Sequence, residues 1–245
     1  MKKDGYLVLE GSQIASVAPL TEETLDLFIP EQIEQGEYTV DVSLVLKKDQ
    51  KWASVGHEVA FGQYVYTIEG SPQKIKRLPV QVGDCDVNIG VKGKDFHAIF
   101  SKSFGAPISL KYAGKEIINK PLMPNFWRAM TDNDRGNNMA GHNAQWKIAS
   151  LYAKHTKVEL EKNTESATIT YTYDLHTTPK AYCKVSYSVY GDGEIKVKMA
   201  YDGNNELSNM PAFGITWKIP ADYENLEWYG NGPEETYTDR KHGAR

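Results

Sequence analysis

The stretch Tyr187-Ser-Val-Tyr-Gly-Asp-Gly-Glu-Ile-Lys-Val-Lys-Met199 places two runs rich in Tyr, Val and Ile on either side of a Gly-Asp-Gly turn. Glycine tolerates the positive φ that a tight turn between antiparallel strands needs, so this stretch predicts a β-hairpin. Two further hairpins are predicted by the pairs of runs Asp86–Val91 with Asp95–Ser101, and Ile108–Tyr112 with Lys115–Ile118. Successive hairpins favour an all-β fold.

The N-terminal part of the sequence shows the same period of two. Tyr38–Lys47 alternates apolar and polar side chains, which is typical of a strand with one buried face. His57–Glu69 continues the pattern, with a register break near Gly62 that predicts a bulge. Thr24–Ile29 alternates as well. These short strands predict a small β-sandwich over residues 1–78.

A connector separates this region from a second one. Glycine, serine and two prolines over residues 70–79 predict an interdomain segment. The second domain is then expected over residues 79–245. It contains the only helix that the sequence predicts, at about 143–154, whose apolar side carries Ile148 and Leu151.

Composition sets bounds on partners and compartment. The chain has 245 residues and a formal net charge of -4, which gives no reason to expect nucleic acid or an anionic membrane as a partner. No run approaches the roughly 20 apolar residues of a membrane span, and no signal peptide is evident. We therefore expect a cytoplasmic protein.

Cys85 and Cys183 belong to no metal or disulfide motif and are predicted to be buried or partly buried free thiols.

General motifs for catalysis are not found. There is no phosphate-binding glycine loop, no nucleophile elbow and no histidine pair with metal-ligand spacing. Glu234 and Glu235 are adjacent, so on a strand they would point to opposite faces and could not act together. Asp132 begins a stretch like a calcium loop, but Gly136 and Asn143 stand where ligands belong. The sequence predicts no catalytic residue, metal or cofactor in this chain.

One polar segment stands out. Thr131–Gly141 contains two Asp, three Asn and two Gly, a composition that a core cannot hold without partners for every polar group. It predicts a surface loop, or a loop that borders a polar pocket. Composition alone leaves both possibilities open.

Four segments of the sequence form an ordered series: Trp52–Ala60 with Gln63, Pro124-Asn-Phe-Trp-Arg-Ala-Met-Thr-Asp-Asn-Asp-Arg-Gly136 with Gln145-Trp146, Met210-Pro-Ala-Phe-Gly214, and Trp228-Tyr-Gly-Asn-Gly-Pro-Glu-Glu-Thr-Tyr-Thr-Asp-Arg240. In this order they resemble the C-terminal region of family 2 β-galactosidases. The resemblance implies an immunoglobulin-like linking sandwich followed by a galactose-mutarotase-like β-supersandwich that is incomplete at its C-terminus.

The resemblance also implies a function. The chain would be the non-catalytic segment of a retaining enzyme that hydrolyses terminal β-D-galactosyl residues of lactose-type substrates. A (β/α)8 barrel domain or large subunit, its expected partner, would carry the catalytic glutamates, and Mg²⁺ and Na⁺ would be held by residues outside this chain. The polar segment would lie at the substrate mouth through Gly136, Asn137, Asn138, Gly141, His142 and Asn143. Its base would be supported by Arg128, Asp132, Asn133 and Asp134.

Two other functions are compatible with the residues. A stand-alone carbohydrate-binding module would use the 15 Tyr and five Trp for stacking on sugars. An enzyme like the aldose epimerases would need an acid and a base facing each other, and no histidine here lies in a motif for that role. A sandwich with missing strands would expose unpaired edges, so we also expect an oligomer.

Overall fold

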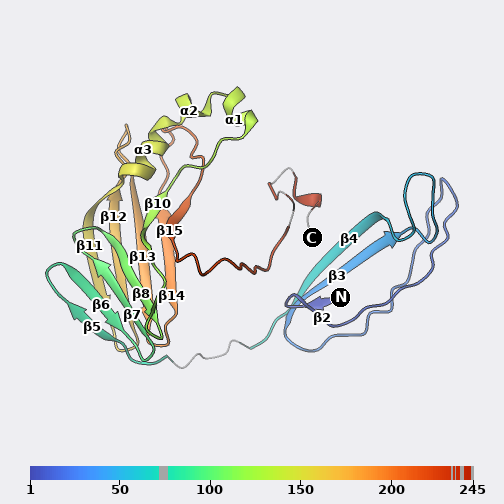
Figure 1. Cartoon of the computed structure of the whole chain (residues 1–245), viewed down its shortest axis with the longest axis horizontal. Helices are drawn as coiled ribbons and strands as arrows, with labels where there is room; N and C mark the ends of the chain where they lie inside the picture. The colour runs from blue at the N-terminus through green and yellow to red at the C-terminus, as the bar shows by residue number, and fades with distance from the viewer. Residues whose placement is uncertain (72–76, 233, 235, 238–239, 244–245) are drawn as a thin grey trace. The chain divides into compact units, whose positions relative to one another are not determined.

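The computed structural model describes residues 1–71, 77–232, 234, 236–237 and 240–243. Contacts divide the chain into two compact units, Met1–Lys74 with Leu226–Arg245 and Ile75–Asn225 (Figure 1). Every sheet is antiparallel, and the helices within the described ranges are short. The predicted all-β class is confirmed, and the several antiparallel sheets are consistent with β-sandwich folds. No helix of the described part is long and apolar enough to cross a membrane.

The first unit is built on one four-stranded sheet in the order β2-β1-β3-β4. Its strands are β1 Lys2–Lys3, β2 Tyr6–Leu7, β3 Gly36–Val45 and β4 Glu58–Ile68. The strands β3 and β4 correspond to two of the predicted strands and pair with each other, but the bulge lies elsewhere than expected. Gly62 pairs regularly with Val42, and the register shifts between Leu44 and Val45, where Val59 is the extra residue.

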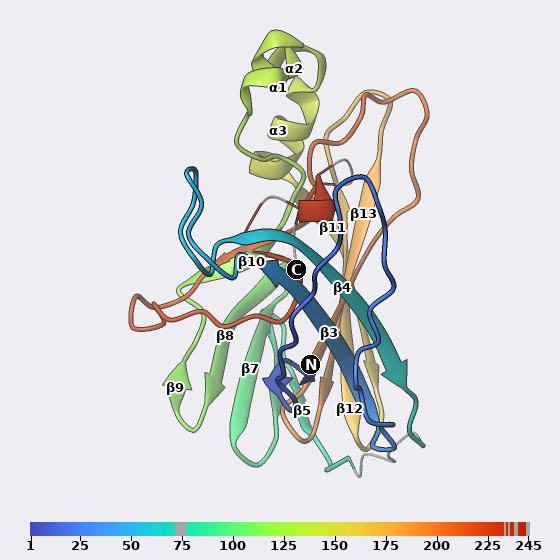
Figure 2. The same cartoon turned by 90° about the vertical axis from the view of Figure 1, so that its right-hand side faces the viewer.

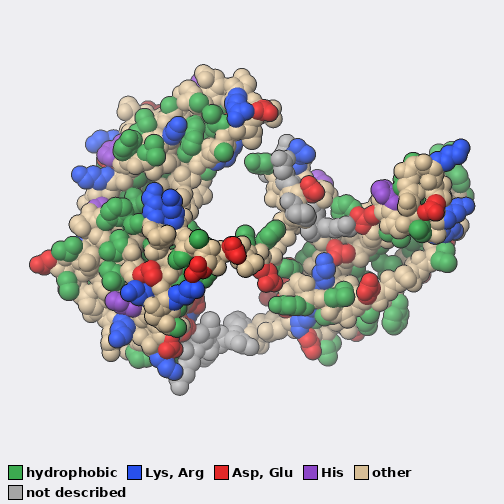
Figure 3. All heavy atoms as spheres, in the orientation of Figure 1, with side chains coloured by type: hydrophobic (Ala, Val, Ile, Leu, Met, Phe, Trp, Pro, Cys, Tyr) green, Lys and Arg blue, Asp and Glu red, His purple; other side chains and the backbone are tan. Residues whose placement is uncertain are grey.

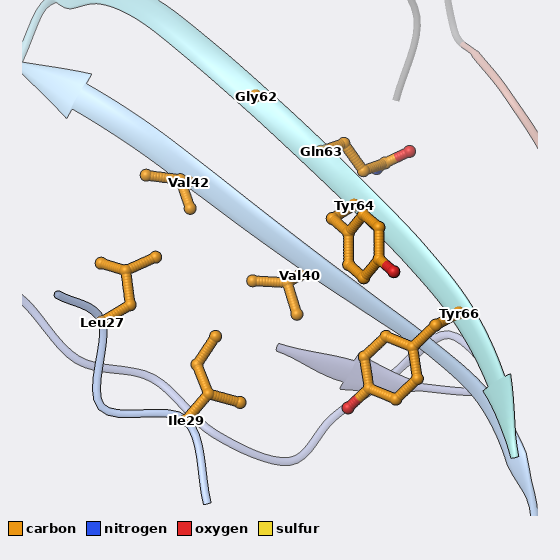
Figure 4. A pocket seen from close by; sticks show the side chains of 8 residues that line it. All are labelled: Leu27, Ile29, Val40, Val42, Gly62, Gln63, Tyr64 and Tyr66. Atoms are coloured by element: carbon orange, nitrogen blue, oxygen red, sulfur yellow. The ribbon is translucent and has the colours of Figure 1, made fainter. Parts of the chain in front are cut away.

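Thr24–Ile29, predicted to be a strand, forms none. Instead Leu27 and Ile29 lie beside Val40 and Val42 and line a hollow of about 470 Å³ on the sheet (Figure 4). The alternation of apolar side chains in this segment therefore reflects packing onto the face of a sheet. It does not reflect hydrogen-bonded pairing within one.

The C-terminal residues make contacts within the first unit. The hydroxyl of Tyr229 donates a hydrogen bond to Glu37 Oε1 at 2.6 Å. The contact units thus differ from the predicted domains, residues 1–78 and 79–245, which stay a prediction. Residues 72–76 of the expected connector lie outside the described residues, as do positions 233, 235, 238 and 239 of the motif that ends at Arg240. The short helix η1 spans Lys241–Gly243.

The second unit is a sandwich of two main sheets. The five-stranded sheet contains β5 Gln81–Asp84, β6 Asn88–Lys92, β7 Phe96–Ser101, β8 Ala106–Tyr112 and β9 Lys115–Glu116. The four-stranded sheet contains β11 Lys154–Lys162, β12 Ser166–Asp174, β13 Tyr182–Tyr190 and β14 Ile195–Tyr201. All three hairpins predicted from the sequence are confirmed, between β6 and β7, between β8 and β9, and between β13 and β14.

The core of the second unit lies between these two sheets. Alternate residues of β12, such as Ile169 and Tyr171, are completely buried, as the period of two requires. The ring of Phe100 on β7 lies 5.6 Å from that of Tyr187 on β13. The Tyr171 hydroxyl donates to the backbone oxygen of Ser101 at 3.1 Å, so this buried polar atom is satisfied across the sandwich.

A third, two-stranded sheet pairs β10 Lys120–Asn125 with β15 Gly214–Lys218. Three helices follow β10, namely α1 Asp132–Gly136, α2 Met139–His142 and α3 Ala144–Tyr152. They gather at one end of the sandwich (Figure 2). The sequence predicted α3 but neither of the two shorter helices.

Two sequence predictions of burial are partly wrong. The predicted apolar side of α3, with Ile148 and Leu151, is exposed, and Trp146 and Ala149 face the core instead. Both cysteines are free, and Cys183 is buried as expected, but Cys85 is exposed because it follows an edge strand at a turn.

Candidate functional site

The candidate site is the polar end of the second unit, where α1 and α2 follow β10. Thr131 caps α1: its hydroxyl accepts a hydrogen bond from the backbone N–H of Asp134, and the Asp134 carboxylate accepts one from the backbone N–H of Thr131. This reciprocal pair satisfies two backbone donors at the helix start. Five residues are too few for a stable isolated helix, so the cap fixes where the chain turns.

Arg128 and Asp134, both predicted to support the base of this segment, form a two-pronged ion pair. Arg128 Nη1 donates to Asp134 Oδ2 at 2.5 Å, and Nη2 donates to Oδ1 at 3.0 Å. The hydrogen bonds from Arg128, together with those from Thr131, hold the pKa of the Asp134 carboxyl well below its ordinary value. The pair is therefore ionised at every physiological pH.

The same arginine joins two of the sequence motifs that are far apart in the chain. Arg128 Nε donates to the backbone oxygen of Pro211 at 3.2 Å. The backbone N–H of Ala212 donates to the Phe126 oxygen at 3.2 Å, and the rings of Phe126 and Phe213 lie 6.3 Å apart. The pairing of β10 with β15 brings these motifs together, which the sequence did not reveal.

Asp132 and Asn133, also predicted to support the base, make other contacts. Asp132 accepts a hydrogen bond from Arg135 at 2.8 Å, and both side chains are largely exposed. The backbone oxygen of Asn133 accepts the N–H of Asn137. Within α1, the carboxylate on the Arg128 side is that of Asp134, whereas Asp132 lies on the solvent side.

The predicted mouth segment consists of helical turns rather than an irregular loop. Gly136 ends α1, Asn137 follows it, and Asn138 adopts the left-handed conformation with φ of 51° before α2. Gly141 and His142 belong to α2, and Asn143 separates it from α3. All six residues are exposed except Asn143, which is half-buried. Their polar groups are available to a ligand or a partner.

Sequence reasoning missed the anchor of this segment. Met139 is only 5% exposed, although its neighbours on both sides are exposed. One apolar side chain within a polar run was the available signal, because a flexible thioether fills irregular gaps well. Met139 fixes the middle of the segment, while Arg128 and Asp134 fix its start.

The described residues contain no group of three or more His, Cys, Asp or Glu side chains that could hold a metal ion. The hollow in the first unit is lined by apolar side chains, by Gln63, and by the rings of Tyr64 and Tyr66. Such a lining suits an apolar side chain better than a sugar, whose hydroxyls need several polar partners.

Known sequences match the whole length of this chain. The family described as beta-galactosidase, domain 4, matches residues 1–67, and the family described as beta galactosidase small chain matches residues 92–245. The β-galactosidase of Halalkalibacterium halodurans is 44% identical over 99% of the chain, which covers 24% of that relative. The β-galactosidase of Clostridium acetobutylicum is 39% identical over 100% of the chain, which covers 27% of it.

A separate subunit also matches. The β-galactosidase small subunit of Latilactobacillus sakei is 34% identical over 69% of the chain, which covers 58% of that subunit. The chain thus spans about a quarter of the length of the long relatives named above. The two family matches and these identities show that the chain belongs to the β-galactosidase family and corresponds to part of its C-terminal region.

Proposed function

We propose that this chain is a non-catalytic C-terminal segment of a retaining β-galactosidase that hydrolyses terminal β-D-galactosyl residues of lactose-type substrates. A (β/α)8 barrel, in the same chain or in a large subunit, would carry the catalytic carboxylates and any Mg²⁺ or Na⁺. The observation that carries the proposal is the exposed polar segment 136–143, held at a fixed place by Arg128, Asp134 and Met139. The similarity of the whole chain to β-galactosidases that are about four times its length also supports the proposal.

One close pair of acidic side chains in the second unit, Asp192 and Glu194, fits a structural role better than a catalytic one. A retaining glycosidase needs two carboxyl groups about 5 Å apart, one of them protonated. Asp192 and Glu194 approach one another, but both form ion pairs with Arg77 Nη1, at 2.6 and 2.8 Å. Burial alone would raise the pKa of Asp192, but hydrogen bonds from the Glu194 backbone and from Arg77 lower it. These carboxylates suit a structural ion pair, not a general acid.

The mouth segment would contribute to substrate binding rather than to bond cleavage. Asn137 and Asn138 expose amide groups that can both donate and accept hydrogen bonds, as sugar hydroxyls require. Asn138 has a left-handed backbone conformation, which asparagine adopts more readily than most residues other than glycine. We expect these amides to face the barrel or the bound galactoside.

Fragment complementation tests the proposal. The chain alone should not hydrolyse a chromogenic β-galactoside, and co-expression with the portion of the Halalkalibacterium halodurans enzyme that precedes the matched region should restore hydrolysis. Activity of the extensively repurified chain alone would overturn the non-catalytic role. Heat released when lactose is titrated into the isolated chain would favour a stand-alone carbohydrate-binding module instead.

The complemented enzyme also tests the mouth segment. Replacing Asn138 with Gly removes the amide but keeps the left-handed backbone, and Asn137→Ala removes the neighbouring amide. We expect the double variant to raise KM several-fold, with a smaller effect on kcat, because the groups act on binding. Lys111→Ala, an exposed change on β8, is the matched control and should leave both constants unchanged. Unchanged KM in the double variant would remove the segment from the site.

A further inference from the structure

The outward face of α3 is an apolar stripe that no other described part of the second unit covers. The exposed fractions of Ile148, Leu151 and Tyr152 are 48%, 65% and 66%. Residues three and four positions apart lie on the same side of a helix, so these three side chains form one surface. Figure 3 shows hydrophobic side chains, in green, in the region of α3.

This orientation of α3 is fixed by its opposite face. Trp146 is 1% exposed, and its indole Nε1 donates to the backbone oxygen of Ser208 at 2.8 Å. Ser150 donates to the Trp146 oxygen and accepts from the backbone N–H of Phe126 at 2.8 Å. Turning the helix to bury Leu151 would break these bonds and expose the largest side chain of the core. The apolar stripe is thus a stable feature of the surface.

The stripe has the composition of an interface. Its centre is aliphatic and aromatic, and Lys147 and Gln145 stand at its two margins. An apolar centre within a polar rim is typical of the contact regions between proteins, and a tyrosine at the edge adds a hydroxyl for a hydrogen bond. The lysine at one margin suits an acidic side chain on the facing surface.

We propose that this face of α3 is the docking surface for the catalytic portion of the same enzyme, an inference that rests on the proposed function. About three quarters of the length of the long relatives lies outside this chain, so a large body is available to cover the stripe. α3 begins directly after Asn143, the last residue of the mouth segment. Nine helical residues span about 14 Å, which is short enough for one large body to contact both the mouth segment and the stripe.

A titration of the chain into the separately prepared catalytic portion of the Halalkalibacterium halodurans enzyme tests the docking surface. Leu151→Asp and Ile148→Asp should raise the chain concentration for half-maximal galactoside hydrolysis about tenfold or more, because each places a carboxylate in an apolar contact. The rate at saturating chain should stay that of the wild type. Val87→Asp, at another apolar residue that is 56% exposed, is the matched control and should behave as the wild type.

The outcomes separate this inference from the proposed function. If the wild-type chain restores hydrolysis and both aspartate variants give its concentration dependence, the docking surface is wrong and the proposed function stands. If the wild-type chain neither binds in sedimentation nor restores hydrolysis, the proposed function fails and the docking surface with it. If the isolated chain sediments as a dimer that Leu151→Asp dissociates, a second copy occupies the stripe and the inference is overturned. Leu151→Gln provides a neutral variant if the aspartate impairs folding, which circular dichroism would reveal.

Discussion

The guanidinium of Arg128 and the carboxylate of Asp134 meet through two parallel hydrogen bonds, at 2.5 and 3.0 Å. A planar fork of this kind fixes both the distance and the orientation of its partners, which a lysine could not do. Because Arg128 also binds the backbone oxygen of Pro211, the start of α1 is tied to the segment that precedes β15. The mouth segment thus begins from a fixed point.

Asp134→Asn should loosen the mouth segment without unfolding the sandwich. The change removes the charge from the fork and weakens the hydrogen bonds at the start of α1. We expect amide hydrogen exchange over residues 131–143 to become several-fold faster, with the strands of the two main sheets unaffected. Asp132→Asn, in the same helix but on its exposed side, is the control. Equal rates of amide hydrogen exchange in Asp134→Asn and Asp132→Asn would show that the Arg128–Asp134 ion pair does not order the segment.

The stability that the Arg128–Asp134 ion pair contributes should decrease on acidification. The pKa of Asp134 in the folded chain lies below its unfolded value of about 3.9, because Arg128 and Thr131 stabilise the carboxylate. The ion pair contributes fully to stability when the pH is above the pKa of Asp134 in the unfolded chain. The contribution is lost as the pH falls through the pKa of Asp134 in the folded chain. The difference in unfolding free energy between wild type and Asp134→Asn should be constant from pH 5 to 7 and shrink below pH 4, as urea unfolding can measure. A difference that grows on acidification would contradict this assignment.

The strand pairs could be predicted because their signals are local. A tight turn such as Ala113-Gly114, where both residues have positive φ, has its own sequence signature, and the alternation beside it gives the buried face. The burial of α3 could not be predicted, because Trp146 with Ala149 and Ile148 with Leu151 both have helical spacing. The choice between them depends on Ser208, which accepts the indole hydrogen bond from 62 residues away.

In the candidate site, too, some features could be predicted from the sequence and others depend on residues far apart in the chain. The family resemblance implied that Arg128, Asp132, Asn133 and Asp134 support the segment, and the structure brings Arg128 and Asp134 of these four into an ion pair. The contact of Arg128 with Pro211 depends on the pairing of β10 with β15, two strands between which three helices and the whole four-stranded sheet lie in the sequence. No local pattern reports such a pairing, since each strand is short and carries few alternating residues.

The two thiols should react very differently with a disulfide reagent. Burial raises the pKa of the Cys183 thiol to about 12, so its thiolate is scarce at pH 8, whereas Cys85 is exposed. One equivalent of thiol should react rapidly in the native chain and a second only after unfolding in urea. Cys85→Ser should abolish the rapid phase. Two rapid equivalents in the native protein would mean that the core around Cys183 opens readily.

Two glycines should differ in how strongly their replacement by alanine changes stability. A Cβ at Gly191, in the turn between β13 and β14, would lie 1.8 Å from the backbone oxygen of Leu78, so the connector would have to move. We expect Gly191→Ala to lower the free energy of unfolding by about 1–3 kcal/mol, as overpacking does. A Cβ at Gly136 meets nothing within 4 Å, so Gly136→Ala should be neutral or slightly stabilising. Equal urea midpoints for the two variants would disprove the close approach at Gly191.

Trp146 should be the most sensitive position at the helical end of the second unit. Trp146→Ala removes a buried ring beside Phe126 and Tyr201, and large-to-small changes of this kind cost about 3–5 kcal/mol. Trp146→Phe keeps most of the apolar volume but leaves the backbone oxygen of Ser208 without its donor, at a cost of about 1–3 kcal/mol.

Far-ultraviolet circular dichroism in urea can follow both variants without relying on tryptophan fluorescence. Trp217→Phe, at a ring that is 46% exposed on β15, is the control and should change stability by less than about 0.5 kcal/mol. If Trp146→Phe were as stable as the wild type, the indole hydrogen bond would not be what orients α3. The helix could then rotate so that the apolar stripe of Ile148, Leu151 and Tyr152 turns inward. The hydrogen bond of Trp146 would no longer explain why these three side chains are exposed.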